Sequence, residues 1–179
     1  MPLTIIFETH STTFDNEAGL ASGHSETDLS PAGEAQARAL GARRASEHFD
    51  GVFASDLGRA RRTAELAFAS RDLAIECDER LREIDYGTLT CRPRAVIDAV
   101  RLRHVDEPFP GGESYREATA RVAEYVADMR RRFPDGRICV IGHFATHLGL
   151  EHLFTGVSIA DALSAPYQWQ PGWEYRDQR

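Results

Sequence analysis

The sequence predicts an α/β fold, a three-layer sandwich in which a mostly parallel central sheet has helices on both faces. Two short apolar runs, residues 3–7 and 138–141, are rich in β-branched residues, which is typical of strands buried on both faces. Segments with helical periodicity alternate with the expected strands, and this alternation favours a parallel sheet. The 179 residues, of which 42% are hydrophobic and 27% charged, fit a single domain spanning residues 1–179.

The first half of the chain predicts two strands, each followed by a helix. The strand at residues 3–7 is stopped by polar residues around His10. Ser30 is a favourable N-cap and Pro31 a favourable first helical residue, so we expect a helix from there to about residue 47. Residues 52–54 predict a second strand. An amphipathic helix over residues 57–68 follows it, with an apolar face made of Leu57, Ala60, Ala64, Ala67 and Phe68.

The second half predicts a weaker strand at residues 73–75, then an irregular region with a helix near residues 94–103. Turn-forming residues at 108–114 lead into a long helix that ends at the Pro-Asp-Gly sequence of residues 134–136. The buried strand at residues 138–141 comes next and stops at a Gly-His pair. The apolar positions of the long helix are Ala118, Val122, Tyr125, Val126, Met129 and Phe133.

The C-terminal segment at residues 167–175 is rich in aromatic residues. We expect it to pack over the core as a closing strand or tail. An aromatic lid over a substrate is the alternative.

Composition excludes several classes of function. The net charge of −7 and the pI of about 5.5 come from acidic residues spread along the chain, so no basic stripe is available to bind a nucleic acid. The N-terminus lacks the features of a signal peptide, and no apolar run reaches membrane-spanning length, so we expect a cytoplasmic protein without membrane contact. Three widely spaced cysteines, Cys77, Cys91 and Cys139, indicate neither a disulfide framework nor a structural zinc site.

Histidines follow both strands that are expected to be buried. His10 and His143 lie at the carboxyl ends of these strands, where α/β sheets bind their ligands. Arg59 falls in the first turn of the helix at residues 57–68, for which Ser55 or Asp56 is the expected N-cap, and a helix N-terminus with a guanidinium is an anion site. Glu83 lies in an irregular stretch, where a movable acid is expected.

These residues belong to a longer pattern that resembles the histidine phosphatase superfamily, which includes phosphoglycerate mutases and broad phosphatases. The family opens with a strand and Arg-His-Gly, where this chain has Thr9-His10-Ser11 followed by Thr12, Thr13 and Asn16. The resemblance implies a phosphoglycerate mutase-like fold. Later blocks match in family order, namely Ser22-Gly23, Leu29-Ser30 with Gly33, residues 55–65, residues 81–87 and residues 110–114.

The resemblance implies a phosphatase that acts on a small phosphorylated metabolite and needs no metal or organic cofactor. His10 would accept the phosphoryl group, Arg59 and His143 would hold its oxygens, and Glu83 would protonate the leaving oxygen. Hydrolysis is expected over mutase activity because the chain is short for a mutase. A homodimer is compatible with the sequence. By the same resemblance, the further substrate contacts are Asn16, Thr13, Ser22 and Gly23.

Three departures from the family pattern bear on activity. Thr9 replaces a guanidinium, and losing one preorganised charge donor costs about 2.7–4 kcal/mol, or about a hundred- to thousand-fold in rate. Glu8 would repel a phosphate unless it faces away or pairs with an arginine. Phe144 follows the second histidine where glycine is common, so we expect a bulkier and less polar pocket wall. The arginines considered as partners of Glu8 are Arg82, Arg92, Arg94 and Arg116.

Other interpretations fit the same residues. Because the motif arginine is missing, Glu8, His10, Glu83 and His143 could support acid–base chemistry, such as an isomerisation or dehydration, on a substrate without phosphate. A catalytically silent binding module is a second alternative. Glu79 or Asp85 could take the place of Glu83. His147 is interpreted as a packed or solvated helix residue, although its four-residue spacing from His143 and Glu151 makes a metal site conceivable.

Overall fold

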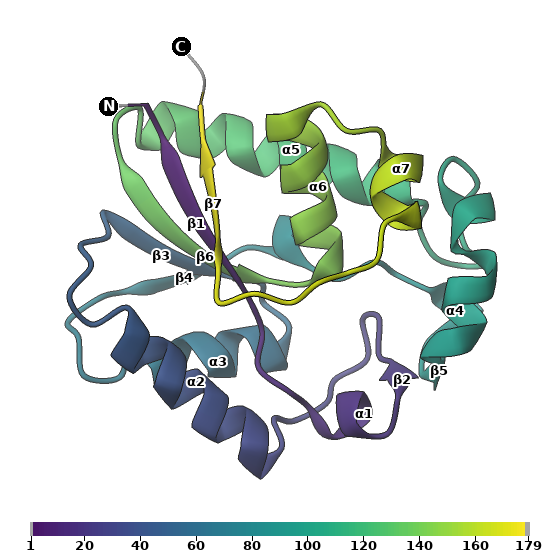
Figure 1. Ribbon diagram of the computed structural model, residues 1–179, viewed down its shortest axis with the longest axis horizontal. Helices are drawn as coiled ribbons and strands as arrows, with labels where there is room; N and C mark the ends of the chain where they lie inside the picture. Colours follow the sequence, from purple (N-terminus) through teal and green to yellow (C-terminus); the bar gives the residue numbers. More distant parts are fainter. Residues whose placement is uncertain (1, 178–179) are drawn as a thin grey trace.

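The computed structural model describes residues 2–177, and within that range five strands form a central sheet in the order β4-β3-β6-β1-β7 (Figure 1). All neighbouring pairs are parallel except β1 and β7, which are antiparallel. The predicted mostly parallel α/β sheet is therefore confirmed. The strands span Thr4–Thr9 (β1), Gly51–Ala54 (β3), Ile75–Cys77 (β4), Arg137–Gly142 (β6) and Trp173–Arg176 (β7).

Helices cover both faces of this sheet, as expected for a three-layer sandwich (Figure 1). Helices α2 (Pro31–Arg43) and α3 (Gly58–Phe68) lie on one face, and α5 (Tyr115–Arg132) and α6 (Phe144–Thr155) lie on the other. Successive side chains of a strand point to opposite faces. Ile5 and Phe7 of β1 therefore join the core under α5 and α6, and Ile6 joins the core under α2 and α3.

A smaller group of elements lies beyond the carboxyl ends of the parallel strands. It has its own buried cluster, in which Ile97, Phe109 and Tyr115 pack together. This group forms one wall of the site described below. It contains α1 (Phe14–Glu17), β2 (Leu20–Ala21), β5 (Arg92–Pro93), α4 (Arg94–Val100) and α7 (Ile159–Ser164), with 3-10 turns at Glu79–Leu81 (η1), Gly87–Leu89 (η2) and Arg101–His104 (η3).

Several expected boundaries are wrong. Helix α2 ends at Arg43 rather than near residue 47, because its C-cap Arg44 already begins a turn. The strand expected at residues 73–75 is shifted to Ile75–Cys77, where it pairs with β3. The helix expected at residues 94–103 changes to a 3-10 turn after Val100.

The expected N-cap of α3 is also wrong. The N-cap is Leu57, which makes no side-chain capping bond. The Asp56 carboxylate instead accepts a hydrogen bond from Arg82 Nε at 2.8 Å, and Ser55 Oγ accepts one from the Leu57 backbone N–H at 3.3 Å. The C-terminal segment does contribute a closing strand, β7. Among residues 2–177, no helix combines the length and the hydropathy needed to cross a membrane.

Candidate active site

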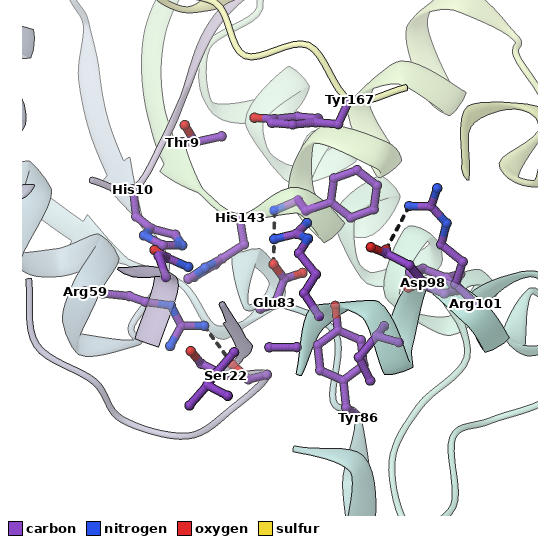
Figure 2. A pocket seen from close by; sticks show the side chains of 18 of the residues that line it. Thr9, His10, Ser22, Arg59, Glu83, Tyr86, Asp98, Arg101, His143 and Tyr167 are labelled. Carbon is purple, nitrogen blue, oxygen red and sulfur yellow. Dashed lines mark hydrogen bonds and ion pairs between the residues drawn. The ribbon is translucent and has the colours of Figure 1, made fainter. Parts of the chain in front are cut away.

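The pairing of β1 with β6 brings two histidines together at the end of the sheet. Thr9 lies opposite Gly142 in the parallel register, and the His10 backbone N–H donates to the Gly142 carbonyl at 2.9 Å. His10 and His143 each follow the last residue of their strand, so their rings meet with centroids 4.9 Å apart. Figure 2 shows the two imidazoles side by side, with Arg59 on one side and Glu83 on the other.

His10 is held in one tautomer. Its Nδ1 lies 2.8 Å from the Ser11 carbonyl oxygen, which can only accept, so Nδ1 carries the proton and Nε2 keeps a free lone pair. Burial, with a smaller contribution from the positive charge of Arg59, lowers the pKa of His10 from 6.5 to about 3. The imidazole is therefore neutral near pH 7 and has the form that a nucleophile requires.

His143 lies in a pocket that leaves its ring without a partner. The residue is fully buried, and neither ring nitrogen has a hydrogen-bond partner among residues 2–177. Burial, followed by the charges of Arg59 and His10, lowers the pKa of His143 well below its usual value. Buried polar atoms in proteins almost always have partners. A bound ligand with oxygen atoms would supply the missing one.

Arg59 is fixed by the loop that follows β2. Its Nη1 donates to the Ser25 carbonyl at 2.9 Å and its Nη2 to the Gly23 carbonyl at 2.7 Å. Gly23 has a φ of +53°, and a Cβ there would lie 3.3 Å from the Ile84 carbonyl oxygen, so this close loop favours glycine. Arg59 is 2% exposed, and its guanidinium cannot move without breaking these bonds.

Glu83 is anchored rather than movable, which contradicts the expectation from its irregular stretch. Its carboxylate accepts backbone hydrogen bonds from Ile84 at 2.9 Å, Ala145 at 2.9 Å and Phe144 at 3.2 Å. The last two are the first N–H groups of α6, which have no partner within the helix. Glu83 therefore caps the helix that follows His143, and its carboxylate is held beside that histidine.

The backbone of Glu83 is fixed as well. Its carbonyl accepts hydrogen bonds from His24 Nε2 at 2.7 Å and Arg121 Nη2 at 3.0 Å. His24 had no role in the sequence analysis, because a single polar residue in a loop gives no signal of a contact so distant in the chain. Neither Glu79 nor Asp85 lines the cavity described next, so neither replaces Glu83.

Two adjoining cavities open around His10. The first has a volume of about 170 Å³ and is lined by seven of the eight predicted site residues, namely His10, Asn16, Ser22, Gly23, Arg59, Glu83 and His143. The second has a volume of about 490 Å³ and extends towards α2, where Gln36 and Arg43 line it. Their shared lining consists of Thr9, His10, Asn16, Leu20, Arg94 and Trp169.

Thr13 is the predicted site residue that lies outside both cavities. It is fully buried and is the N-cap of α1, where its hydroxyl accepts the Asn16 backbone N–H at 3.1 Å. The Asn16 side chain accepts the Thr13 N–H in return, also at 3.1 Å. The expectation of a substrate contact at Thr13 is therefore corrected. Thr13 positions Asn16, which does line the cavities.

Glu8 faces away from the first cavity, because adjacent residues of a strand point to opposite sides. Its carboxylate binds Arg43 Nη2 at 2.9 Å and Arg44 Nε at 2.9 Å. None of the four arginines named as candidates is its partner. Glu8 does line the second cavity, where Arg43 and Arg44 neutralise its carboxylate.

Several lining residues were missed. The first cavity is also walled by Phe144, as expected, and by Tyr167, whose ring packs edge-on against it at 5.7 Å and whose hydroxyl points towards Thr9 (Figure 2). The C-terminal segment thus provides a strand and an aromatic wall. Arg94, Asp98 and Arg101 all line this cavity, and their helical spacing is a sequence signal that could have placed α4 and η3 at the site.

The conceivable metal site does not form. The described residues contain no group of three or more histidine, cysteine, aspartate or glutamate side chains placed to hold a metal ion. Instead the Tyr175 hydroxyl donates to Glu151 at 2.8 Å and accepts from His147 Nδ1 at 2.9 Å. His147 is a packed helix residue, as interpreted.

Comparison with known proteins gives a family match over most of the chain. A family model described as "Histidine phosphatase superfamily (branch 1)" matches residues 5–168. A 2,3-bisphosphoglycerate-dependent phosphoglycerate mutase of Methylobacterium sp. (strain 4-46) is 37% identical over 147 residues, which cover 75% of this chain and 70% of the mutase.

Solved structures share the fold. Bacillus stearothermophilus YhfR superposes with a TM-score of 0.83 at 24% identity, covering 96% of this chain and 90% of that one. A mycobacterial glucosyl-3-phosphoglycerate phosphatase in complex with VO3 gives a TM-score of 0.81 at 24% identity, covering 91% and 85%.

Proposed function

The chain belongs to the histidine phosphatase superfamily (branch 1), and from this membership we propose that it is a phosphatase that hydrolyses a small phosphorylated metabolite through a phosphohistidine at His10. The observation that carries the proposal is the His10 imidazole. It is neutral, its Nδ1 is bound by the Ser11 carbonyl, and its free Nε2 lies beside the unpartnered His143 and the fixed Arg59. A tetrahedral phosphate would give His143 the oxygen partner that it lacks and would place the charge of Arg59 beside an anion.

In the first step, His10 Nε2 attacks phosphorus in line with the ester oxygen. The N–P bond forms as the P–O ester bond breaks, and Glu83 donates a proton to the departing alkoxide. Arg59 and His143 offset the charge on the equatorial oxygens. Because His143 is neutral in the free protein, it contributes as a hydrogen-bond donor, and Arg59 contributes the charge.

In the second step, water attacks phosphorus from the side that the alcohol has left. Glu83, now ionised, takes a proton from this water, the N–P bond breaks, and phosphate is released. His10 returns to its starting form, with the proton still on Nδ1. The anchored position of Glu83 suits both steps, because the leaving oxygen and the incoming water occupy the same side of the phosphoryl group.

The test compares wild type with His10→Ala and His10→Gln on p-nitrophenyl phosphate and a panel of sugar and acid phosphates. We expect both variants to lose turnover completely within detection, since they remove the nitrogen atom that attacks phosphorus. The exposed histidine His48 provides a matched control, and His48→Gln should keep wild-type turnover. Rapid quenching followed by mass spectrometry should detect the phosphorylated peptide that contains His10.

The opposite results are equally clear. If His10→Ala turns over these esters as fast as wild type, the nucleophile is wrong. If wild type hydrolyses nothing, the substitution at Thr9 supports the alternative of an acid–base enzyme on the same scaffold. Wild type would then be assayed for isomerisation or dehydration of unphosphorylated substrates, with Glu83→Gln as the variant that should stop the reaction.

A mutase is the second candidate, because a relative that is 37% identical is a phosphoglycerate mutase. Both reactions begin with the same phosphohistidine. They differ in the group that accepts the phosphoryl from His10, which is water in one and a second hydroxyl in the other. Phosphorus NMR of a reaction with 3-phosphoglycerate distinguishes them, since a phosphatase releases inorganic phosphate and a mutase forms the isomeric ester.

A further inference from the structure

The charged groups that line the first cavity nearly all have partners of their own. Asp98 pairs with Arg101 at 3.3 Å, and Arg59 donates to two backbone carbonyls. The Glu83 carboxylate accepts backbone N–H groups. Arg94 is therefore the charged residue of this lining whose side chain is left to bind a ligand. A phosphate monoester carries up to two negative charges, and Arg59 alone does not balance them.

We infer that Arg94 is a second cation that binds the phosphoryl group, an inference that rests on the proposed phosphatase function. Among residues 2–177, the Arg94 guanidinium makes no hydrogen bond and no ion pair. Arg92 and Arg103 share that property, but they line neither cavity. Arg94 thus combines a free guanidinium with a place in the wall of the site.

The backbone of Arg94 is held firmly while its side chain stays free. The Arg94 N–H donates to the Gly19 carbonyl at 2.9 Å, and the Cys91 N–H donates to the Ala21 carbonyl at 2.8 Å. Cys91 has a φ of +61°, a conformation that costs a residue with a side chain and persists where the surroundings enforce it. These contacts tie the start of α4 to β2, which follows the loop of His10.

Arg94 lines the same two cavities as His10 and Thr9. Its charge is near enough to His10 to contribute to the lowered pKa of that imidazole. Position 9 is neutral in this chain, and beside it the cavity wall is completed by Tyr167. A long arginine reaching in from α4 supplies the positive charge that the strand end does not, and the ligand class that it selects is a phosphate dianion.

The experiment compares Arg94→Gln and Arg94→Lys with Arg92→Gln, a control two residues away that is also exposed and unpaired. We expect Arg94→Gln to lower kcat/KM on phosphate esters about ten- to a hundredfold, as for lost hydrogen bonds to a charged group. The affinity for orthovanadate, measured by calorimetry, should fall by a similar factor. Arg94→Lys should retain part of both, and Arg92→Gln should leave both unchanged. Equal behaviour of Arg94→Gln and Arg92→Gln would overturn the inference.

A double-mutant cycle with Thr9→Arg adds a readout that a structural role would not affect. If the two positions can provide the same charge, Thr9→Arg should raise activity more in the Arg94→Gln background than in wild type. Equal gains in both backgrounds would contradict this. The proposed function fails separately, when wild type shows no His10-dependent turnover, and vanadate binding then still tests Arg94 because it requires an anion site rather than catalysis.

Discussion

At the scale of single residues, the chemistry depends on keeping two imidazoles uncharged. His10 is neutral because its ring is largely withdrawn from water and lies next to the charge of Arg59, and His143 is neutral because it is fully buried without any partner. A protonated His10 would have no lone pair for phosphorus. The loss of solvation at these two rings therefore sets the protonation state that catalysis needs.

This burial predicts a specific loss of stability in acid. Below pH 6.5 the unfolded chain protonates its histidines, whereas folded His10 stays neutral until about pH 3. The unfolded state then binds more protons than the folded state. The free energy of unfolding therefore decreases as the pH is lowered, by up to about 1.4 kcal/mol per pH unit for each such histidine. Denaturant unfolding of wild type, His10→Asn and His143→Asn at pH 6.5 and 5.0 measures the effect.

Each variant should lose less stability than wild type between these two pH values, whatever its stability at pH 6.5. The carboxylates with lowered pKa, such as Asp56 and Asp78, titrate below this window and do not obscure it. His48→Asn serves as the exposed control and should follow wild type. Identical losses in all four proteins would mean that neither imidazole is held neutral.

The residues of the site were predictable where a strand end or a family block marked them. His10, His143, Arg59 and Glu83 meet as expected. Arg94 was considered only as a partner of Glu8, because its helical spacing with Asp98 and Arg101 does not say that this face of a short helix turns towards the end of the sheet. Thr13 was misplaced because capping an α1 turn and contacting a substrate favour the same small polar residues.

At the scale of elements, strands and helices were predicted correctly where their buried faces give the apolar residues a regular pattern in the sequence. Strands β1, β3 and β6 and helices α3 and α5 lie within a few residues of their expected ranges. The paired strands β2 and β5 were missed, since each is two residues long and their pairing is set by the loops around them. Strand β4 is exposed along much of its length, so its apolar pattern was too weak to fix its register.

The strained residue that precedes β5 gives the second prediction. Cys91 is exposed, so replacing its side chain removes little packing, but its φ of +61° disfavours any residue with a Cβ. Cys91→Gly should therefore leave stability unchanged or raise it by up to about 1 kcal/mol. Cys91→Val should lower it by about 1–3 kcal/mol, because a β-branched residue fits this conformation worst.

Thermal and denaturant unfolding of the two variants checks this difference. Equal stability of Cys91→Gly and Cys91→Val would show that the backbone relaxes at this position. The activity of Cys91→Gly should also stay at the wild-type level, since the hydrogen bond from its N–H to Ala21 is retained.

At the scale of the whole molecule, one ion-pair network joins the sheet to a helix and to the C-terminal strand. Glu8 of β1 binds Arg43 and Arg44, and Arg44 also binds Glu47 and the Pro171 carbonyl. Through Glu47 the network continues to Arg137 of β6, which pairs with Glu174 of β7. The network therefore joins β1, β6 and β7 to the C-terminal end of α2.

Glu8 is the centre of this network and is only 3% exposed, so its loss should be costly. Glu8→Gln leaves Arg43 without its carboxylate partner and Arg44 with Glu47 alone. Breaking a buried ion pair by removing one partner costs about 3 kcal/mol. Denaturant unfolding should show a loss of this size. The exposed residue Glu65 pairs with Arg61 and Arg62 at 3.8 and 3.6 Å, and Glu65→Gln should change stability by less than about 1 kcal/mol.

The same variant decides whether Glu8 affects the substrate. Glu8 lines the second cavity but not the first, and two arginines balance its charge. KM for phosphate esters should therefore stay within about twofold of wild type under conditions where Glu8→Gln is folded. If Glu8 instead repelled the substrate, removing its charge would lower KM several-fold. That outcome would show that Arg43 and Arg44 do not neutralise Glu8. The network would then hold β1 in position without shielding the substrate from the negative charge of Glu8.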